Sequence, residues 1–153
     1  MQALSLPVAN DAFANFAGIT RRQRILHQDN NTIVLEDYAH HPSEIRVLLD
    51  ALSDNYADYQ LQLIFQPHRF SRTACLAQEF ARVLSGLDSL WLMPVYAAHE
   101  NFRENGTSEA IAKSLSGKAT LLNAEPAALA KLKKAGKDSH KTLYAFVGAG
   151  DIG

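Results

Sequence analysis

The chain has 153 residues, which favours one domain with a buried core, and 15 basic against 16 acidic side chains give a net charge of −1. This balance excludes a global field that would draw the chain to nucleic acid or an anionic membrane, and the single cysteine, Cys75, excludes an internal disulfide. No apolar run has transmembrane length and no secretory leader is visible, so we expect a cytoplasmic protein.

Short apolar runs alternate with amphipathic stretches along most of the sequence. Residues 8–18 have a helical pattern, and residues 19–29 are ambiguous, with an edge strand as one possibility. Further along, β-branched and apolar runs predict strands, and apolar residues at helical spacing predict helices. The predicted strands are 32–37, 61–66, 89–96, 118–123 and 142–150, and the predicted helices are 43–56, 73–87, 107–117 and 125–136.

This alternation predicts an α/β fold with a mostly parallel, Rossmann-like sheet and helices on both faces. Ligands of such sheets bind outside the carboxyl ends of the strands. The site is therefore expected in the segments that follow strands, which are 37–42, 66–73, 96–107 and 148–153.

The segment QPHRFSRT, residues 66–73, carries a histidine and two arginines between a predicted strand and a predicted helix. Arg72 would lie where the helix opens, and a helix N-terminus carries partial positive charge. Guanidinium groups bind carboxylates and phosphates bidentately, so His68, Arg69 and Arg72 form a candidate anion site. The alternative is a solvated loop whose arginines pair with surface acids.

The segment DYAHHP, residues 37–42, sets two histidines side by side. Neighbouring side chains of an extended backbone point to opposite sides, so His40 and His41 are poorly placed to chelate one ion, and we predict no metal site. We expect one histidine to be held structurally and the other to face the cleft. Asp37 ends its strand and is either an acceptor for a ligand hydroxyl or a helix-capping acid.

The segment GAGDIG, residues 148–153, matches the G-x-G-x-x-G pattern of dinucleotide-binding turns. The sequence offers no second βα unit after it and no acid about 20 residues on, so we favour glycines that permit a tight turn. No G-x-x-x-x-G-K-[ST] phosphate loop occurs in the sequence. If the protein works with ATP, the main phosphate cradle must come from elsewhere.

The chain resembles the carboxyl-terminal domain of the Mur ligases in five segments, which occur in the family's order and spacing: NFAGITRRQRIL, EDYAHHPSEI, FQPHRFSRT, PVYAAHE and GAGDIG. The resemblance runs from about residue 8 to the end. Within the family, the pair of segments DYAHHP and FQPHRFSRT resembles the corresponding segments of the branch that joins L-alanine to UDP-N-acetylmuramate. This implies one Mur ligase carboxyl-terminal domain over residues 1–153, with the UDP-sugar domain and the P-loop ATPase domain absent from this chain.

The resemblance also implies a reaction in peptidoglycan synthesis. The central domain of such ligases holds most of the ATP and Mg²⁺, and an acyl phosphate forms on the muramate carboxylate. The amine of L-alanine then attacks it, and phosphate leaves. The third domain closes over ATP and brings the amino acid, so we expect no catalytic residue in this domain alone and no ligation by these 153 residues.

The matching motifs imply residue roles. Arg22 would face ATP from the domain hinge, and Asp37 would accept from the ribose hydroxyls. The nucleotide would be bound by Arg22, Asp37, Tyr38 and His40, and the amino acid by His41, His68, Arg69 and Arg72. The alanine carboxylate would lie on the last three, in agreement with the anion site inferred from the residues.

The sequence departs from the family pattern at three places. Gln23 stands where the family usually has an aromatic residue, His99 stands where it has glycine, and the loop 100–108 differs from the common form. The conformation of the 96–100 loop is therefore in question.

Two other functions compete with the ligase domain. One is a stand-alone module that kept the fold and binds an amino acid or nucleotide without catalysis. The other is a small dinucleotide-binding domain that rests on GAGDIG and would be identified by NAD binding. The joint presence of Asp37, His68, Arg69 and Arg72 favours the ligase domain over the stand-alone module.

Overall fold

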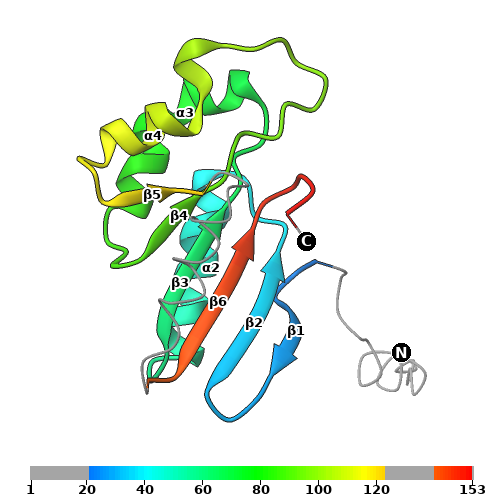
Figure 1. Ribbon diagram of the computed structural model, residues 1–153, viewed down its shortest axis with the longest axis vertical. Coiled ribbons are helices and arrows are strands. Elements are labelled where there is room, and N and C mark those ends of the chain that lie inside the picture. The colour runs from blue at the N-terminus through cyan, green and yellow to red at the C-terminus, as the bar shows by residue number, and fades with distance from the viewer. Residues whose placement is uncertain (1–20, 123–139, 153) are drawn as a thin grey trace, which may run out of the picture.

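The computed structural model describes residues 21–122 and 140–152, in which six strands form one sheet in the order β1-β2-β6-β3-β4-β5 (Figure 1). The edge strand β1 pairs antiparallel with β2, and all other neighbours pair in parallel. The strands are β1 (Arg24–Gln28), β2 (Thr32–Asp37), β3 (Gln60–Phe65), β4 (Leu90–Leu92), β5 (Ala119–Leu121) and β6 (Thr142–Val147). The mostly parallel sheet is confirmed, and the ambiguous stretch 19–29 contains the edge strand.

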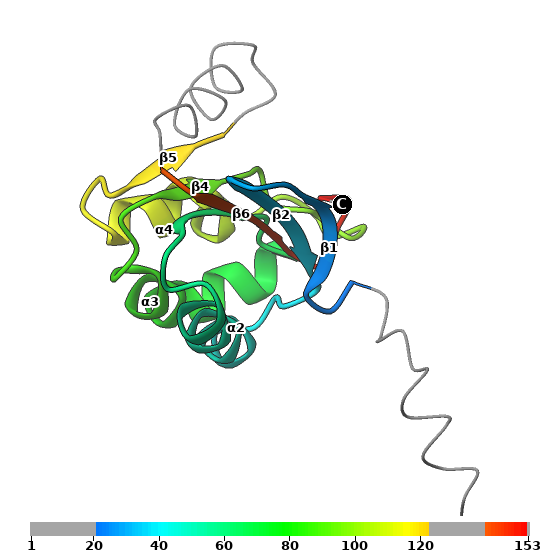
Figure 2. The same cartoon turned by 90° about the horizontal axis from the view of Figure 1, so that it is seen from below.

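Within the described ranges, three α-helices and one 3₁₀ turn connect the strands: α2 (Pro42–Asn55), α3 (Phe70–Leu84), η1 (Glu104–Gly106) and α4 (Ser108–Ser114). All three α-helices lie on the same side of the sheet (Figure 2). The predicted helices at 8–18 and 125–136 lie outside the described residues.

The main core lies between the sheet and these helices. Alternate residues of the central strands point to this face because strand side chains alternate with period two. The strands contribute Ile33, Leu35, Leu63, Phe65, Leu143, Ala145 and Val147, and the helices contribute Ile45, Leu48, Leu52, Phe80 and Leu84. Each large apolar side chain buried in this way stabilises the fold by about 1.5–3 kcal/mol relative to exposure.

Helix α3 begins at Phe70, three residues before the predicted start at Thr73. The turn into the helix is made at Arg69, which has a φ of 71°. The Arg69 carbonyl accepts from the backbone N–H of Thr73 (3.0 Å) and from its hydroxyl (2.9 Å). Arg72 therefore lies inside the first helical turn and not at its opening.

The loop 96–107 packs tightly on the start of α3. A Cβ at Gly106 would lie 2.2 Å from the carbonyl oxygen of Phe70, so only glycine permits this approach. The rings of Phe70 and Phe102 meet edge to face, with their centroids 5.5 Å apart. The position of the loop is thus coupled to the turn that carries the arginines.

We expect Gly106→Ala to lower the free energy of unfolding by about 1–3 kcal/mol, because backbone atoms must move to admit the methyl group. Gly86→Ala is the matched control, since an added Cβ there meets nothing within 4 Å. Its effect should stay within about 0.5 kcal/mol. Denaturant unfolding measures both variants, and equal unfolding free energies would contradict the close approach at Gly106.

Candidate functional site

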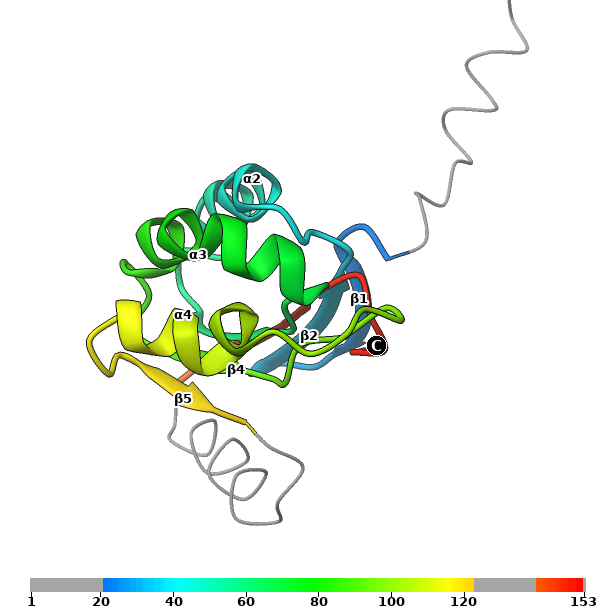
Figure 3. The same ribbon diagram turned by 90° about the horizontal axis from the view of Figure 1, so that it is seen from above.

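The carboxyl ends of β2, β6, β3 and β4 lie side by side at one edge of the sheet, which Figure 3 views from above. Backbone hydrogen bonds of 2.9 Å continue the pairing just past the strand ends, from Gly148 to Asp37, from Gln66 to Val147 and from Met93 to Phe65. The segments that the sequence selected for the site therefore start from one edge of the sheet.

Four rings form a row across this edge. The ring centroids of Tyr38 and His40 are 5.2 Å apart, those of His40 and His68 are 5.9 Å apart, and those of His68 and Tyr96 are 5.5 Å apart and nearly parallel. The guanidinium of Arg21 lies 5.3 Å from the Tyr38 centroid. Three of the predicted site residues, Tyr38, His40 and His68, are thus brought together.

The two adjacent histidines have different roles, as expected. His41 is the N-cap of α2: its Nδ1 accepts from the Ser43 hydroxyl (2.8 Å) and backbone N–H (3.4 Å), and Glu44 completes a capping box by accepting from the His41 N–H. His40 donates from Nδ1 to the Tyr38 carbonyl (2.9 Å), and its ring belongs to the row. His41 is the structural member of the pair, and its hydrogen bonds are local to the helix start.

Asp37 is only 5% exposed, and both of its carboxylate oxygens accept backbone N–H groups. Oδ2 accepts from Gln23 (2.9 Å) and Oδ1 from Ala39 (2.7 Å), so Asp37 ties the entry of β1 to the turn after β2. Each oxygen keeps a second lone pair. Asp37 also borders a hollow of about 580 Å³ that it shares with Arg22 and Glu44.

Arg21 lies at the candidate site, and sequence reasoning missed it. Its guanidinium donates to the carbonyls of Gly148 and Gly150, each at 3.1 Å, and lies 3.9 Å from Glu36. Arg21, and not Arg22, therefore contacts the glycine turn. Glu36 in β2 gave no signal for Arg21, because its burial is known only from the fold and its closer partner is Arg24, whose Nη1 donates to Glu36 Oε1 (3.1 Å).

His68, Arg69 and Arg72 lie together in the turn from β3 into α3, which we call the arginine turn (residues 68–72). His68 Nδ1 and Arg72 Nη1 are buried without a hydrogen-bond partner among the described residues. An unpaired buried polar group costs about 1–3 kcal/mol. Arg69 adds strain, because its φ of 71° is rare outside glycine. Unused donors and strain in one turn are typical of a ligand site.

The surroundings of His68 disfavour its charged form. Burial lowers the pKa of His68 below its ordinary value, and the nearby Arg72 guanidinium lowers it further. His40 and Arg69 act in the same direction, whereas Glu100 opposes them. The turn thus has a positive field from its arginines, which suits an anionic ligand.

Glu100 occupies part of the position that the sequence predicted for a ligand anion. Its carboxylate accepts from the Ser71 backbone N–H (2.8 Å) and from the Ser71 hydroxyl at the N-terminus of α3. These bonds lower the pKa of Glu100. The N-terminus of α3 is thus engaged by Glu100, and the side chains of the arginine turn remain the predicted contacts for a ligand anion.

The 96–100 loop keeps the conformation that a glycine would allow. Ala98 and His99 have φ values of 48° and 66°, so His99 adopts the left-handed backbone at the position of the family glycine. The backbone of Tyr96 anchors the loop: its N–H donates to the Pro67 carbonyl and its carbonyl accepts from the Arg69 N–H, each at 2.9 Å. The departure at His99 therefore leaves the loop attached to the arginine turn.

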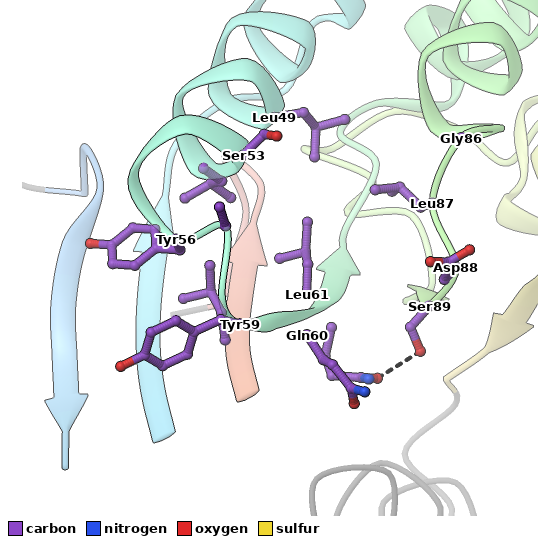
Figure 4. Close-up of a pocket in the computed structure, with 14 residues that line it drawn as sticks. Leu49, Ser53, Tyr56, Tyr59, Gln60, Leu61, Gly86, Leu87, Asp88 and Ser89 are labelled. Carbon is purple, nitrogen blue, oxygen red and sulfur yellow. Dashed lines mark hydrogen bonds between the residues drawn. The ribbon is translucent and has the colours of Figure 1, made fainter. Parts of the chain in front are cut away.

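A second hollow, also of about 580 Å³, lies at the opposite end of the sheet (Figure 4). Its lining includes Leu49, Tyr56, Tyr59, Leu61 and Ser89, from the ends of α2 and α3 and the starts of β3 and β4. Ligands of parallel sheets bind at carboxyl ends, so we place the site at the other edge.

Residues 21–122 and 140–152 contain no group of three or more His, Cys, Asp or Glu side chains that could hold a metal ion. None of the helices in those ranges is long and apolar enough to cross a membrane.

Comparisons with known proteins give one family. Residues 21–150 match the family model described as Mur ligase, glutamate ligase domain. The UDP-N-acetylmuramate–L-alanine ligase of Streptococcus suis is 34% identical, over 96% of this chain and 32% of its own length. The ligase of the same name from Hydrogenobaculum sp. is 31% identical, over 100% of this chain and 33% of its own length. The crystal structure of the Thermotoga maritima ligase of that name is 33% identical, with a TM-score of 0.68, over 93% of this chain and 29% of its own. The chain thus spans about a third of the length of these relatives.

We expect Arg72→Gln to raise the pKa of His68, because the variant removes a positive neighbour. Because the pKa of His68 is lower in the folded state, the free energy of unfolding should fall as the pH drops below about 6.5, the pKa of histidine in the unfolded chain. This fall should be less steep in Arg72→Gln. NMR titration of the His68 ring measures the shift. Arg82→Gln, in the last turn of the same helix, should leave the titration unchanged. An unchanged titration in Arg72→Gln would contradict the assigned cause.

Proposed function

Because the chain belongs to the Mur ligase family, we propose that it is the carboxyl-terminal domain of an ATP-dependent ligase that joins L-alanine to UDP-N-acetylmuramate in peptidoglycan synthesis. The muramate carboxylate would be activated as an acyl phosphate, and the alanine amine would displace phosphate. The names of the relatives support this branch of the family, and the cytoplasm is the proposed location.

One observation carries the amino-acid side of the proposal. The Nη1 of Arg72 and the Nδ1 of His68 are buried polar atoms without a partner among the described residues, and Arg69 lies in the same turn. A carboxylate bound to these groups would be fixed in orientation, with its amine directed toward the acyl phosphate. Such positioning accelerates attack by removing translational and rotational freedom beforehand. His41 would contribute through the exposed side of its ring.

The nucleotide side of the proposal rests on the other end of the ring row. Tyr38 is 38% exposed and Arg22 lines the hollow beside Asp37, so both can face a bound nucleotide. His40 connects this surface to His68. ATP and Mg²⁺ would be held mainly by a central domain with a phosphate loop, and Arg22, Asp37, Tyr38 and His40 would close over the nucleotide from this side.

The competing proposal is a stand-alone binding module. The buried, unpaired groups of the arginine turn suit an anion in either case. The coding frame on both sides of the chain decides between them. A continuous frame with a phosphate loop upstream supports the ligase, and a solitary frame supports the module.

In the complete polypeptide that carries this chain, we expect Arg69→Ala or Arg72→Ala to raise the KM for L-alanine far more than the KM for ATP. Loss of a charge-assisted hydrogen bond is worth about 1.5–3 kcal/mol, roughly 10- to 150-fold. Steady-state phosphate release measures both constants. Arg82→Ala is the control on the exposed far end of α3. An unchanged KM for alanine in both variants would contradict the proposal that these arginines bind the alanine carboxylate.

A further inference from the structure

We propose that Ser71 and Glu100 form a clamp that holds the chain's own carboxylate away from Arg69 and Arg72, and so keeps the arginine turn open for a ligand carboxylate. The inference rests on the proposed function only for the identity of that carboxylate as the one of the incoming amino acid. Glu100 is in this view a positioning residue.

The clamp explains how Glu100 can lie beside the arginine turn without filling it. The charges of Arg69 and Arg103 favour the ionised form of Glu100, although less than its hydrogen bonds to Ser71 do. A free carboxylate beside guanidinium groups pairs with them bidentately and would fill the anion site. In the described part of the chain, no ion pair within 4.0 Å joins Glu100 to an arginine.

Ser71 explains why this pairing does not occur. Its backbone N–H donates to one carboxylate oxygen of Glu100, and its hydroxyl donates to the other. Both oxygens are thereby engaged at the N-terminus of α3, where the helix dipole also favours a negative charge. Hydrogen bonds to an ionised acceptor are about twice as strong as neutral ones.

The position of Ser71 in the helix separates the acid from the arginines. Residues one apart on a helix do not face each other, so a carboxylate bound on Ser71 lies on a different face from the side chain of Arg72. The loop brings Glu100 to this face because Tyr96 is bonded to Arg69 on one side and Gly106 packs on Phe70 on the other. The clamp is thus built from contacts between two segments about thirty residues apart in the sequence.

The test uses acetate as the probe and the isotope-labelled 153-residue chain. NMR follows the side-chain Nε–H of Arg72 during titration. We expect acetate to bind in the wild type, and Ser71→Ala to weaken binding about 2- to 12-fold, because Glu100 then keeps only its bond from the backbone N–H and can compete for the arginines. Ser71→Thr keeps the hydroxyl and should bind as the wild type does. Ser85→Ala, at the far end of α3, is the matched control.

The second arm removes the competitor. In a Glu100→Gln background, Ser71→Ala should change acetate affinity by less than about 1.5-fold, since a neutral amide cannot neutralise an arginine. Glu100→Gln alone should bind acetate at least as tightly as the wild type, and this variant decides the matter if Ser71→Ala fails to fold. A merely structural clamp would instead weaken binding in Ser71→Ala, in Glu100→Gln and in the double variant alike.

Three results would overturn the clamp: no acetate effect on Arg72 in the wild type, an equal loss from Ser71→Ala in both backgrounds, or weaker binding in Glu100→Gln. None of them bears on the KM values of the complete polypeptide, which test the proposed function separately. If the acetate titrations come out as expected but the complete polypeptide does not use alanine, the proposed function is wrong and the clamp still holds.

Discussion

The pairing of His68 with Tyr96 is the contact on which the rest of the site depends. Strands β3 and β4 pair as far as Phe65 and Leu92, and the segments that follow them pair again at His68 and Tyr96. This pairing stacks the rings of His68 and Tyr96, and the Tyr96 carbonyl accepts a hydrogen bond from the N–H of Arg69. The left-handed turn at Arg69 and the start of α3 then follow, as does the approach of Glu100 to Ser71. The proposed ligand site is thereby built from two loops that the parallel sheet brings to one edge.

The arginine turn combines features that lower stability when no ligand is bound. Arg69 has a strained backbone, and buried polar atoms of His68 and Arg72 lack partners among the described residues. Each such feature costs about 1–3 kcal/mol, a large share of the 5–15 kcal/mol that stabilises an ordinary domain. A bound carboxylate would supply acceptors to the arginines. Recognition of an anion is thus a physical explanation for a turn that a purely structural role would not require.

Much of the fold could be predicted from the sequence, because apolar periodicity is local. The parallel sheet and the helices of the described ranges follow from it, whereas the different roles of His40 and His41 follow from the opposite directions of neighbouring side chains in an extended backbone. What could not be predicted depends on contacts between distant segments. The early start of α3 needs the turn at Arg69, and Arg21 reaches a glycine turn 127 residues away in the sequence. The bond between Ser71 and Glu100 spans 29 residues and leaves no local pattern.

The central claim is that the arginine turn binds the carboxylate of an amino acid, and the direct measurement is a paired NMR titration of the labelled chain with L-alanine and with L-alaninamide. The two ligands share the amine and the methyl group, and only alanine carries a carboxylate. The account predicts that alanine shifts the side-chain Nε–H signals of Arg69 and Arg72 and that alaninamide does not. Equal shifts from both ligands, or shifts confined to residues outside the arginine turn, would contradict it.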